Sequence, residues 1–263
     1  MSSVAPIPVP HTLASSTEVS EIANTEAKVG KKNDSSEAIG KKAKVSIEIV
    51  SSDQLPSIAP RLASIVSSHM DLDMSTFFTF PYDLSSSLRL FTSITSSLIP
   101  LTQEEKYQPS FPPPAGGIIL LVAKLYPDEK PLGSIDMEGN PTGNQDIVGS
   151  VQLGFSGMPN GAFRSEVKRM LVDVRYGGRG IGKALLKRLE AEAIKWGSTT
   201  CMLDTEQGSF GEKLYRSCGW TELGVLPKFH WPPDKSEKRS TVFFYKHLDE
   251  DEDEDDDYAS KDV

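Results

Sequence analysis

The sequence predicts an α/β fold in which one mixed central sheet of about seven strands packs against four helices. The first observation is the stretch from residue 167 to 196, which runs from an apolar strand through a glycine-rich turn into an amphipathic helix. The second is the order of the segments: strand, two helices, three strands, helix, strand, helix, two strands. The third is the composition, since 38% hydrophobic residues suffice for one solid core in a chain of 263 residues.

The two ends of the chain differ in composition from the middle. Residues 1–43 are rich in Ser, Ala, Glu and Lys and have few large apolar side chains, so we expect them to be disordered. Residues 249–263 contain ten acidic residues and one lysine, a net charge of −9 that equals the charge of the whole chain. We expect this tail to be disordered too, and the folded domain to span residues 44–248 with an insertion at residues 127–146.

Apolar patterns place the elements on both sides of the glycine-rich turn. Strands are expected at residues 45–50, 118–122, 147–155, 167–174, 200–204, 220–225 and 241–245. A helix that carries Leu55, Ile58, Leu62 and Ile65 follows the capping cluster Ser51–Asp53, and further helices are expected at residues 83–97, 181–196 and 209–217. Residues 69–83 between the first two helices are aromatic and irregular, which suits either a substrate-side loop or a loop that covers the core.

The glycine-rich turn is a plausible phosphate-binding site. Gly177, Gly178, Gly180 and Gly182 allow backbone geometries that other residues avoid. The helix that begins at Ile181 has unpaired N–H groups and a partial positive charge at its start. Glycines directly before such a helix let a phosphate approach the backbone.

Two common phosphate ligands fit this turn poorly. A nucleoside-triphosphate loop needs Ser or Thr after its lysine, whereas Lys183 is followed by Ala184. A dinucleotide fingerprint needs a glycine three residues after Gly180, and Lys183 occupies that position.

The segment resembles motif A of the GCN5-related N-acetyltransferases, the GNAT superfamily, in which a strand, a turn and a helix hold the pyrophosphate of acetyl-coenzyme A. Gly177 stands where that family usually has Gln or Arg, and Arg175 and Arg179 are the candidates to compensate. The resemblance implies a GNAT fold with acetyl-CoA as co-substrate. It implies the following cofactor-binding residues: Met170, Leu171, Val172, Arg175, Gly178, Arg179, Gly180, Ile181, Gly182 and Lys183.

Five further blocks are similar to the tabtoxin-resistance-type acetyltransferases. These blocks lie at residues 149–153, 160–167, 203–220, 224–229 and 241–248. The chain departs from that family at Phe163, usually His, at Ser165, usually Ala, and in the insertion at residues 127–146.

Glu166 is the best candidate for the catalytic base. An alkyl ammonium has a pKa near ~10.4 and must lose a proton before its nitrogen can attack a thioester, and a nearby carboxylate can take this proton. Glu166 lies as far before the glycine turn as the catalytic glutamate of GNAT members that acetylate lysine. Its position also suits a solvated glutamate at the start of a strand.

Asp204 and Tyr215 complete the predicted catalytic residues. By the resemblance, Asp204 orients the acceptor amine or a water, although it could instead only cap the following helix. We expect it to lie well apart from Glu166, because one residue starts a strand and the other ends the neighbouring one. Tyr215 matches the tyrosine that many GNAT enzymes place beside the sulfur to protonate the departing thiolate, and it could also be a core aromatic.

Other chemistries find little support. The four histidines are scattered, no Cys/His spacing suits zinc, and neither Cys201 nor Cys218 lies in a nucleophile motif, so we expect no metal. Outside the acidic tail, basic and acidic residues balance at 27 each, which argues against nucleic acid as a partner. No secretory signal or membrane span is evident, so we expect a cytoplasmic protein, with a nuclear location left open by the Lys31-Lys32 and Lys41-Lys42 pairs.

The sequence thus predicts an acetyl-CoA-dependent N-acetyltransferase that transfers acetyl directly to a primary amine of a small molecule. A protein lysine or N-terminal acetyltransferase is the alternative enzyme, and a non-catalytic acyl-CoA-binding module is the alternative outside enzymes. The sequence leaves the oligomeric state and the identity of the acceptor open.

Overall fold

The computed structural model describes residues 44–72, 74, 78–100, 112–126 and 146–248 of the chain. The predictions of disordered ends at residues 1–43 and 249–263 lie outside these residues, as does nearly all of the predicted insertion.

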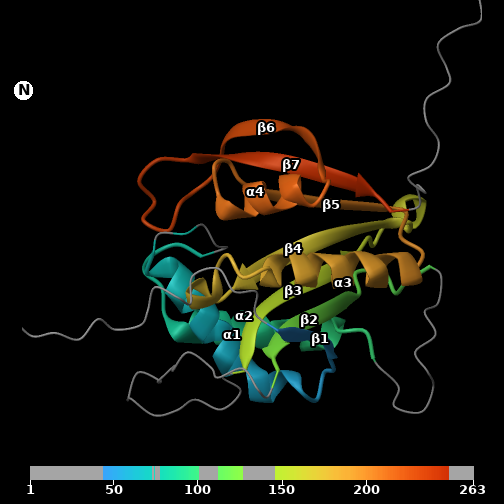
Figure 1. The fold of residues 1–263 in the computed structure, drawn as a ribbon, viewed down its shortest axis with the longest axis horizontal. Helices are drawn as coiled ribbons and strands as arrows, with labels where there is room; N and C mark the ends of the chain where they lie inside the picture. Colours follow the sequence, from blue (N-terminus) through green and yellow to red (C-terminus); the bar gives the residue numbers. More distant parts are fainter. Residues whose placement is uncertain (1–43, 73, 75–77, 101–111, 127–145, 249–263) are drawn as a thin grey trace, which may run out of the picture. The chain divides into compact units, whose positions relative to one another are not determined.

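The described residues form seven strands and four α-helices in the predicted order (Figure 1). The strands are β1 (Val45–Val50), β2 (Ile118–Leu125), β3 (Ile147–Phe155), β4 (Arg164–Val172), β5 (Thr200–Glu206), β6 (Thr221–His230) and β7 (Arg239–His247). The helices are α1 (Leu55–Met70), α2 (Leu84–Ser93), α3 (Ile181–Lys195) and α4 (Phe210–Ser217), with 3-10 turns η1 (Thr95–Ser97), η2 (Pro159–Gly161) and η3 (Val174–Tyr176). The predicted fold class is confirmed.

All seven strands join one sheet in the order β1-β2-β3-β4-β5-β7-β6. The pair of β4 and β5 is parallel, because α3 carries the chain back across the sheet between them, and the other pairs are antiparallel. The sheet is therefore mixed, as predicted, and its single parallel pair lies near its centre.

The helices cover opposite faces of the sheet. Alternate side chains of β2 point to opposite faces and show which helices cover each one. Ile119 and Leu121 belong to the same buried cluster as the apolar residues of α3, whereas Leu120 and Val122 belong to the cluster of α1. Tyr215 of α4 lies in the α3 cluster as well. The α3 and α4 helices therefore share one face, and α1 and α2 cover the other.

Several sequence predictions of element boundaries were wrong in detail; β4 ends at Val172, two residues before its expected end, and β6 extends five residues beyond its own, to His230. The strand β4 begins at Arg164, three residues earlier than expected, because the parallel pairing with β5 starts there. The helix α1 has Gln54 as its N-cap without a side-chain cap, so the predicted capping cluster does not cap it; Pro56, in the first helical turn, favours the start instead.

Among the described residues, every helix is too short or too polar to span a membrane.

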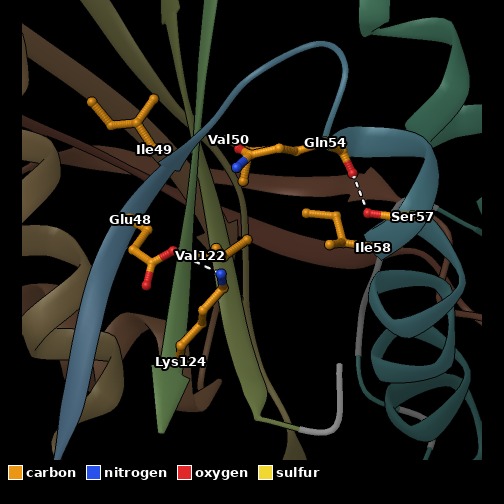
Figure 2. A pocket seen from close by; sticks show the side chains of 8 residues that line it. All are labelled: Glu48, Ile49, Val50, Gln54, Ser57, Ile58, Val122 and Lys124. Carbon is orange, nitrogen blue, oxygen red and sulfur yellow. Dashed lines mark hydrogen bonds and ion pairs between the residues drawn. The ribbon is translucent and has the colours of Figure 1, made fainter. Parts of the chain in front are cut away.

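A cavity of about 220 Å³ lies between β1, β2 and the start of α1 (Figure 2). Its charged side chains, Glu48 and Lys124, are paired with each other at 2.7 Å. The strands that line it are separated from the β4–β5 pair by β3. This cavity is therefore distinct from the candidate site.

Candidate functional site

The strands β4 and β5 pair over only three residues of each strand. The register joins Arg164 to Thr200, Ser165 to Cys201 and Glu166 to Met202, and no later pair is formed between these strands although both continue. Each strand stays paired on its other side, β4 with β3 and β5 with β7. The described part of the sheet is therefore open between the second halves of β4 and β5, next to the start of α3 (Figure 1).

A bulge in β4 lies beside this opening. The register with β3 passes from Ser150 opposite Leu171 to Gln152 opposite Lys168, so β4 holds one more residue than β3 between these pairs. Arg169, within the bulge, has a φ of 49°, a conformation that non-glycine residues seldom adopt. Three of the predicted cofactor-binding residues, Met170, Leu171 and Val172, follow directly along the edge that β5 leaves unpaired.

The predicted phosphate turn connects β4 to α3 through η3. Gly178 and Gly180 have φ values of 74° and 83°, and Gly180 is the N-cap of α3. A Cβ built on either glycine would meet no atom of the described chain within 4 Å. A Cβ on Gly182 would lie 2.9 Å from Leu214, so that glycine allows α3 to pack closely on α4. The turn thus presents open backbone at a helix start, which is the geometry that a diphosphate needs.

The side chains predicted to assist this turn lie in different places. Arg175 donates hydrogen bonds from Nε to Asp173 Oδ1 at 3.0 Å and from Nη2 to Asp173 Oδ2 at 2.5 Å. Arg179 lies over the ring of Tyr176 at 5.4 Å. Lys183 is exposed in the first turn of α3. Arg175 therefore serves the shape of the turn, whereas Arg179 and Lys183 remain near its surface.

Asp173 is a residue that the sequence analysis missed. It is 1% exposed, it caps η3 by accepting from the N–H of Arg175, and it also pairs with Arg61 of α1 at 2.5 Å. Burial alone would raise the pKa of Asp173, but the hydrogen bonds from Arg175 and Arg61 outweigh burial and hold this pKa at about 2. The signal in the sequence is Arg61, a charged residue at a position of α1 where its spacing from Ile58 and Ile65 predicts burial.

Glu166 lies on the face of the sheet opposite to α3. Its neighbour Val167 belongs to the α3 cluster, so the carboxylate points to the face that α1 and α2 cover in part. The carboxylate is exposed and forms an ion pair with Lys168 at 3.0 Å. Glu166 is also the last residue of β4 that pairs with β5, so it lies at the edge of the opening.

Asp204 lies on β5, beyond the residue that pairs with Glu166. It lies two residues, or ~7 Å of strand, beyond Met202, which is the direct partner of Glu166. Both side chains point to the same face, because Leu203 belongs to the α3 cluster. Burial, and then repulsion from Glu166, raise the pKa of Asp204, while His230 lowers it. The prediction that Asp204 ends its strand was wrong, because β5 extends to Glu206.

Tyr215 lies on the other face of the sheet, in the buried cluster of α3. Its ring is 5% exposed and packs against Trp220 and Phe244 at centroid distances of 6.0 and 6.1 Å. Burial, and then the charge of Asp204, raise the pKa of Tyr215 above its ordinary value. The phenol is therefore protonated at neutral pH, and its burial makes it a weaker acid than a free phenol.

A second polar cluster, also missed from the sequence, lies beyond Asp204. Glu206 accepts from His230 Nε2 and from Arg239 Nη1, each at 3.1 Å, and His230 Nδ1 is 2.9 Å from Thr241 Oγ1. These residues come from the ends of β5, β6 and β7, so no sequence pattern joins them. They fill the face next to Asp204 with paired charges.

Two connections meet on this side of the molecule. The N–H of Phe80, between α1 and α2, donates to the carbonyl of Pro233, between β6 and β7, at 2.7 Å. His69, near the end of α1, bonds to Val172 at the end of β4, and His230, at the end of β6, bonds to Glu206 at the end of β5. The two connections therefore meet at the ends of the strands that diverge.

Residues 140–222 match the family model for the acetyltransferase (GNAT) domain. This match includes β3, β4, the glycine turn, α3, β5 and α4. This part of the chain is therefore similar to a GNAT acetyltransferase domain.

Solved structures support the same fold. An N-acetyltransferase from Staphylococcus aureus Mu50 has a TM-score of 0.52 at 17% identity, with 78% of this chain and 99% of that chain covered. The yncA protein of Salmonella typhimurium, solved with its cofactor acetyl-CoA, has a TM-score of 0.51 at 17% identity, with 81% and 99% covered. Identities this low establish the fold, which is the GNAT fold predicted from the sequence.

The match to the acetyltransferase (GNAT) domain supports the prediction of an acetyl-CoA-dependent N-acetyltransferase. The residues present also fit this co-substrate, because the turn at Gly178 and Gly180 leaves space that a Cβ would fill. The closer resemblance to tabtoxin-resistance-type enzymes is not confirmed by these comparisons.

The pKa of Asp173 predicts a pH dependence of stability. Because this pKa is about 2 in the folded chain and near ~3.9 in the unfolded chain, Asp173 stabilises the fold fully above ~3.9 and loses this effect as the pH falls towards 2. Asp173→Asn should therefore lower the free energy of unfolding by about 2 kcal/mol or more at pH 6. The difference between the parent and the variant should shrink between pH 4 and pH 2. Urea unfolding across this range measures it, and a constant difference would contradict the assignment.

Proposed function

We propose that this chain transfers an acetyl group from acetyl-CoA directly to a primary amine of a small molecule. The observation that carries the proposal is the pair of carboxylates, Glu166 and Asp204, on one face of the opening between β4 and β5, with the glycine turn beside it. Acetyl-CoA, when bound, supplies an acetyl group activated as a thioester.

The glycine turn and the edge of β4 are proposed to hold this co-substrate. The backbone N–H groups around Gly178, Gly180, Ile181, Gly182 and Lys183 would bind the diphosphate at the start of α3. The backbone of Met170, Leu171 and Val172 would bind the pantetheine arm as an added strand, because β5 does not pair with β4 along these residues. An N–H of this edge beside the bulge would also polarise the thioester carbonyl.

Glu166 is proposed to remove the proton from the acceptor ammonium. Its carboxylate is exposed, so it can reach an incoming amine directly or through one water. Asp204 would hold the ammonium in place, because a second carboxylate on the same face favours a cation there. Lys168, which pairs with Glu166, would have to release it as the acceptor binds.

Tyr215 is proposed to donate a proton to the departing thiolate. Its ring is fixed by Trp220 and Phe244, and a phenol carries its proton at neutral pH. Free thiols have pKa values near ~8.5, so a thiolate leaves more easily when it is protonated as the bond breaks. Tyr215 and Glu166 would then act from the two opposite faces of the sheet.

Two features support a small acceptor. The bond between Phe80 and Pro233 joins the two connections at the ends of β4 and β5, which restricts the space for a bulky partner there. The similarity of five sequence blocks to tabtoxin-resistance-type acetyltransferases points the same way.

The proposal predicts which acceptors consume acetyl-CoA. When the purified chain is incubated with acetyl-CoA and either a library of small amines or a library of peptides, free CoA should form with small amines. Thiol detection measures the release, and mass spectrometry identifies the acetylated product. Release with peptides alone would favour a protein acetyltransferase, and tight acetyl-CoA binding without release in either library would indicate a binding module.

The role of Glu166 predicts the effect of its amide. Glu166→Gln should lower kcat by about 100-fold, because general base catalysis typically contributes a factor of this order or more. The affinity for CoA should stay unchanged, since Glu166 precedes the edge that binds pantetheine. Glu48→Gln is the matched control, because Glu48 is a strand glutamate that also pairs with a lysine, Lys124. Equal kcat values for Glu166→Gln and the parent at every pH would remove Glu166 as the base.

A further inference from the structure

Arg61 is a charged residue on the buried side of α1. It is 4% exposed, and its neighbours on the helix include Leu62 and Ile65, each 1% exposed. Burying a guanidinium costs free energy unless charged and polar partners compensate. The partners of Arg61 therefore explain why an arginine stands there.

These partners are the ends of two strands. Arg61 Nε donates to the carbonyl of Ile147 at 2.9 Å, at the start of β3, and Arg61 Nη2 donates to Asp173 Oδ2 at 2.5 Å, directly after β4. One planar side chain thus fixes two backbone segments to α1, which a single apolar side chain of the same size could not do.

Asp173 transmits this contact to the glycine turn. Its N–H bonds to the carbonyl of Val148 at 2.9 Å, and its carboxylate caps η3 through the N–H of Arg175 at 3.0 Å. Five residues beyond Asp173 the chain reaches Gly178, whose φ of 74° begins the open backbone of the turn.

The edge of β4 has a separate link to α1. His69 Nε2 lies 2.8 Å from the carbonyl of Val172, and because a carbonyl only accepts, this nitrogen donates. Val172 ends the segment proposed to bind pantetheine. The two contacts of α1 therefore hold two different parts of the cofactor site, Arg61 the turn and His69 the strand.

We propose that Arg61 is a positioning residue for the diphosphate turn and that it sets the affinity for CoA through Asp173. This inference rests on the proposed function, because it assumes that the turn binds the diphosphate of CoA. Its particular consequence is selective: the loss of Arg61 should weaken the binding of ligands that carry the diphosphate and should leave the binding of pantetheine unchanged.

The test compares two ligands on the full chain. Arg61→Met keeps an unbranched side chain and removes the guanidinium. It should weaken CoA binding, measured by calorimetry, by about fivefold to tenfold, a loss within the range seen for residues that affect a site without contacting its ligand. The affinity for pantetheine, measured by NMR titration, should change less than twofold. Arg61→Lys keeps the charge but cannot contact both Ile147 and Asp173. It should weaken CoA binding less than Arg61→Met does, and it should also leave the affinity for pantetheine unchanged.

Ile65→Val is the control for a loss of helix packing alone. Ile65 is a buried residue of the same helix, and this substitution removes one methyl group and lowers stability without touching Asp173. It should leave both affinities unchanged, whereas a purely structural role of Arg61 would reduce the affinities for both ligands by the same factor.

The outcomes separate this inference from the function. Equal CoA affinities of Arg61→Met and the parent, or parallel losses for CoA and pantetheine, would overturn the inference alone. A parent chain that bound neither CoA nor acetyl-CoA would overturn the proposed function as well. If Arg61→Met does not fold, the same two titrations on Arg61→Lys decide.

Discussion

The divergence of β4 from β5 after Glu166 and Met202 is the constraint on which the rest of the site depends. If β4 and β5 stayed paired to their ends, the backbone of residues 170–172 would form hydrogen bonds with β5. No free strand edge would then remain for a ligand. Because both strands are held on their other sides by β3 and β7, the sheet stays intact while its centre opens. The opening is thus a property of the whole sheet, and Glu166 and Asp204 lie beside it on one face.

Electrostatics follows from this arrangement. The charge of Glu166 contributes to the raised pKa of Asp204, and the charge of Asp204 contributes to the raised pKa of Tyr215. Asp173, by contrast, is surrounded by arginine donors and is held ionised. Asp204, beside the opening, is therefore easier to protonate than a free aspartate, whereas Asp173, next to the glycine turn, stays charged. The first environment suits the handling of an ammonium and its proton, and the second suits a fixed structural anchor.

The sequence predicted those parts of the molecule that depend on local pattern. The bounds of β1 and β3, the start of α3 at Ile181 and the order of all elements follow from apolar periodicity and from glycine positions. The glycine turn was found for the same reason, and the conformations of Gly178 and Gly180 agree with it. The cofactor and catalytic roles of the residues chosen from the sequence stay predictions.

The remaining features depend on contacts between distant segments. Arg61 and Asp173 are 112 residues apart, and Glu206 meets His230 and Arg239 only because three strands end together. The register that brings Asp204 towards Glu166 depends on where the parallel pairing begins, and a sequence pattern gives such boundaries poorly. Arg61 alone left a local trace, as a charge on an apolar helix face.

A crystal structure of the chain in complex with acetyl-CoA is the most direct test of the central claim. The account predicts the diphosphate against the backbone N–H groups of residues 178–183 and the pantetheine arm between β4 and β5, along residues 170–172. It also predicts the acetyl group within reach of both Glu166 and Tyr215. A complex in which β4 and β5 closed on each other, or in which the diphosphate lay away from the glycine turn, would contradict it.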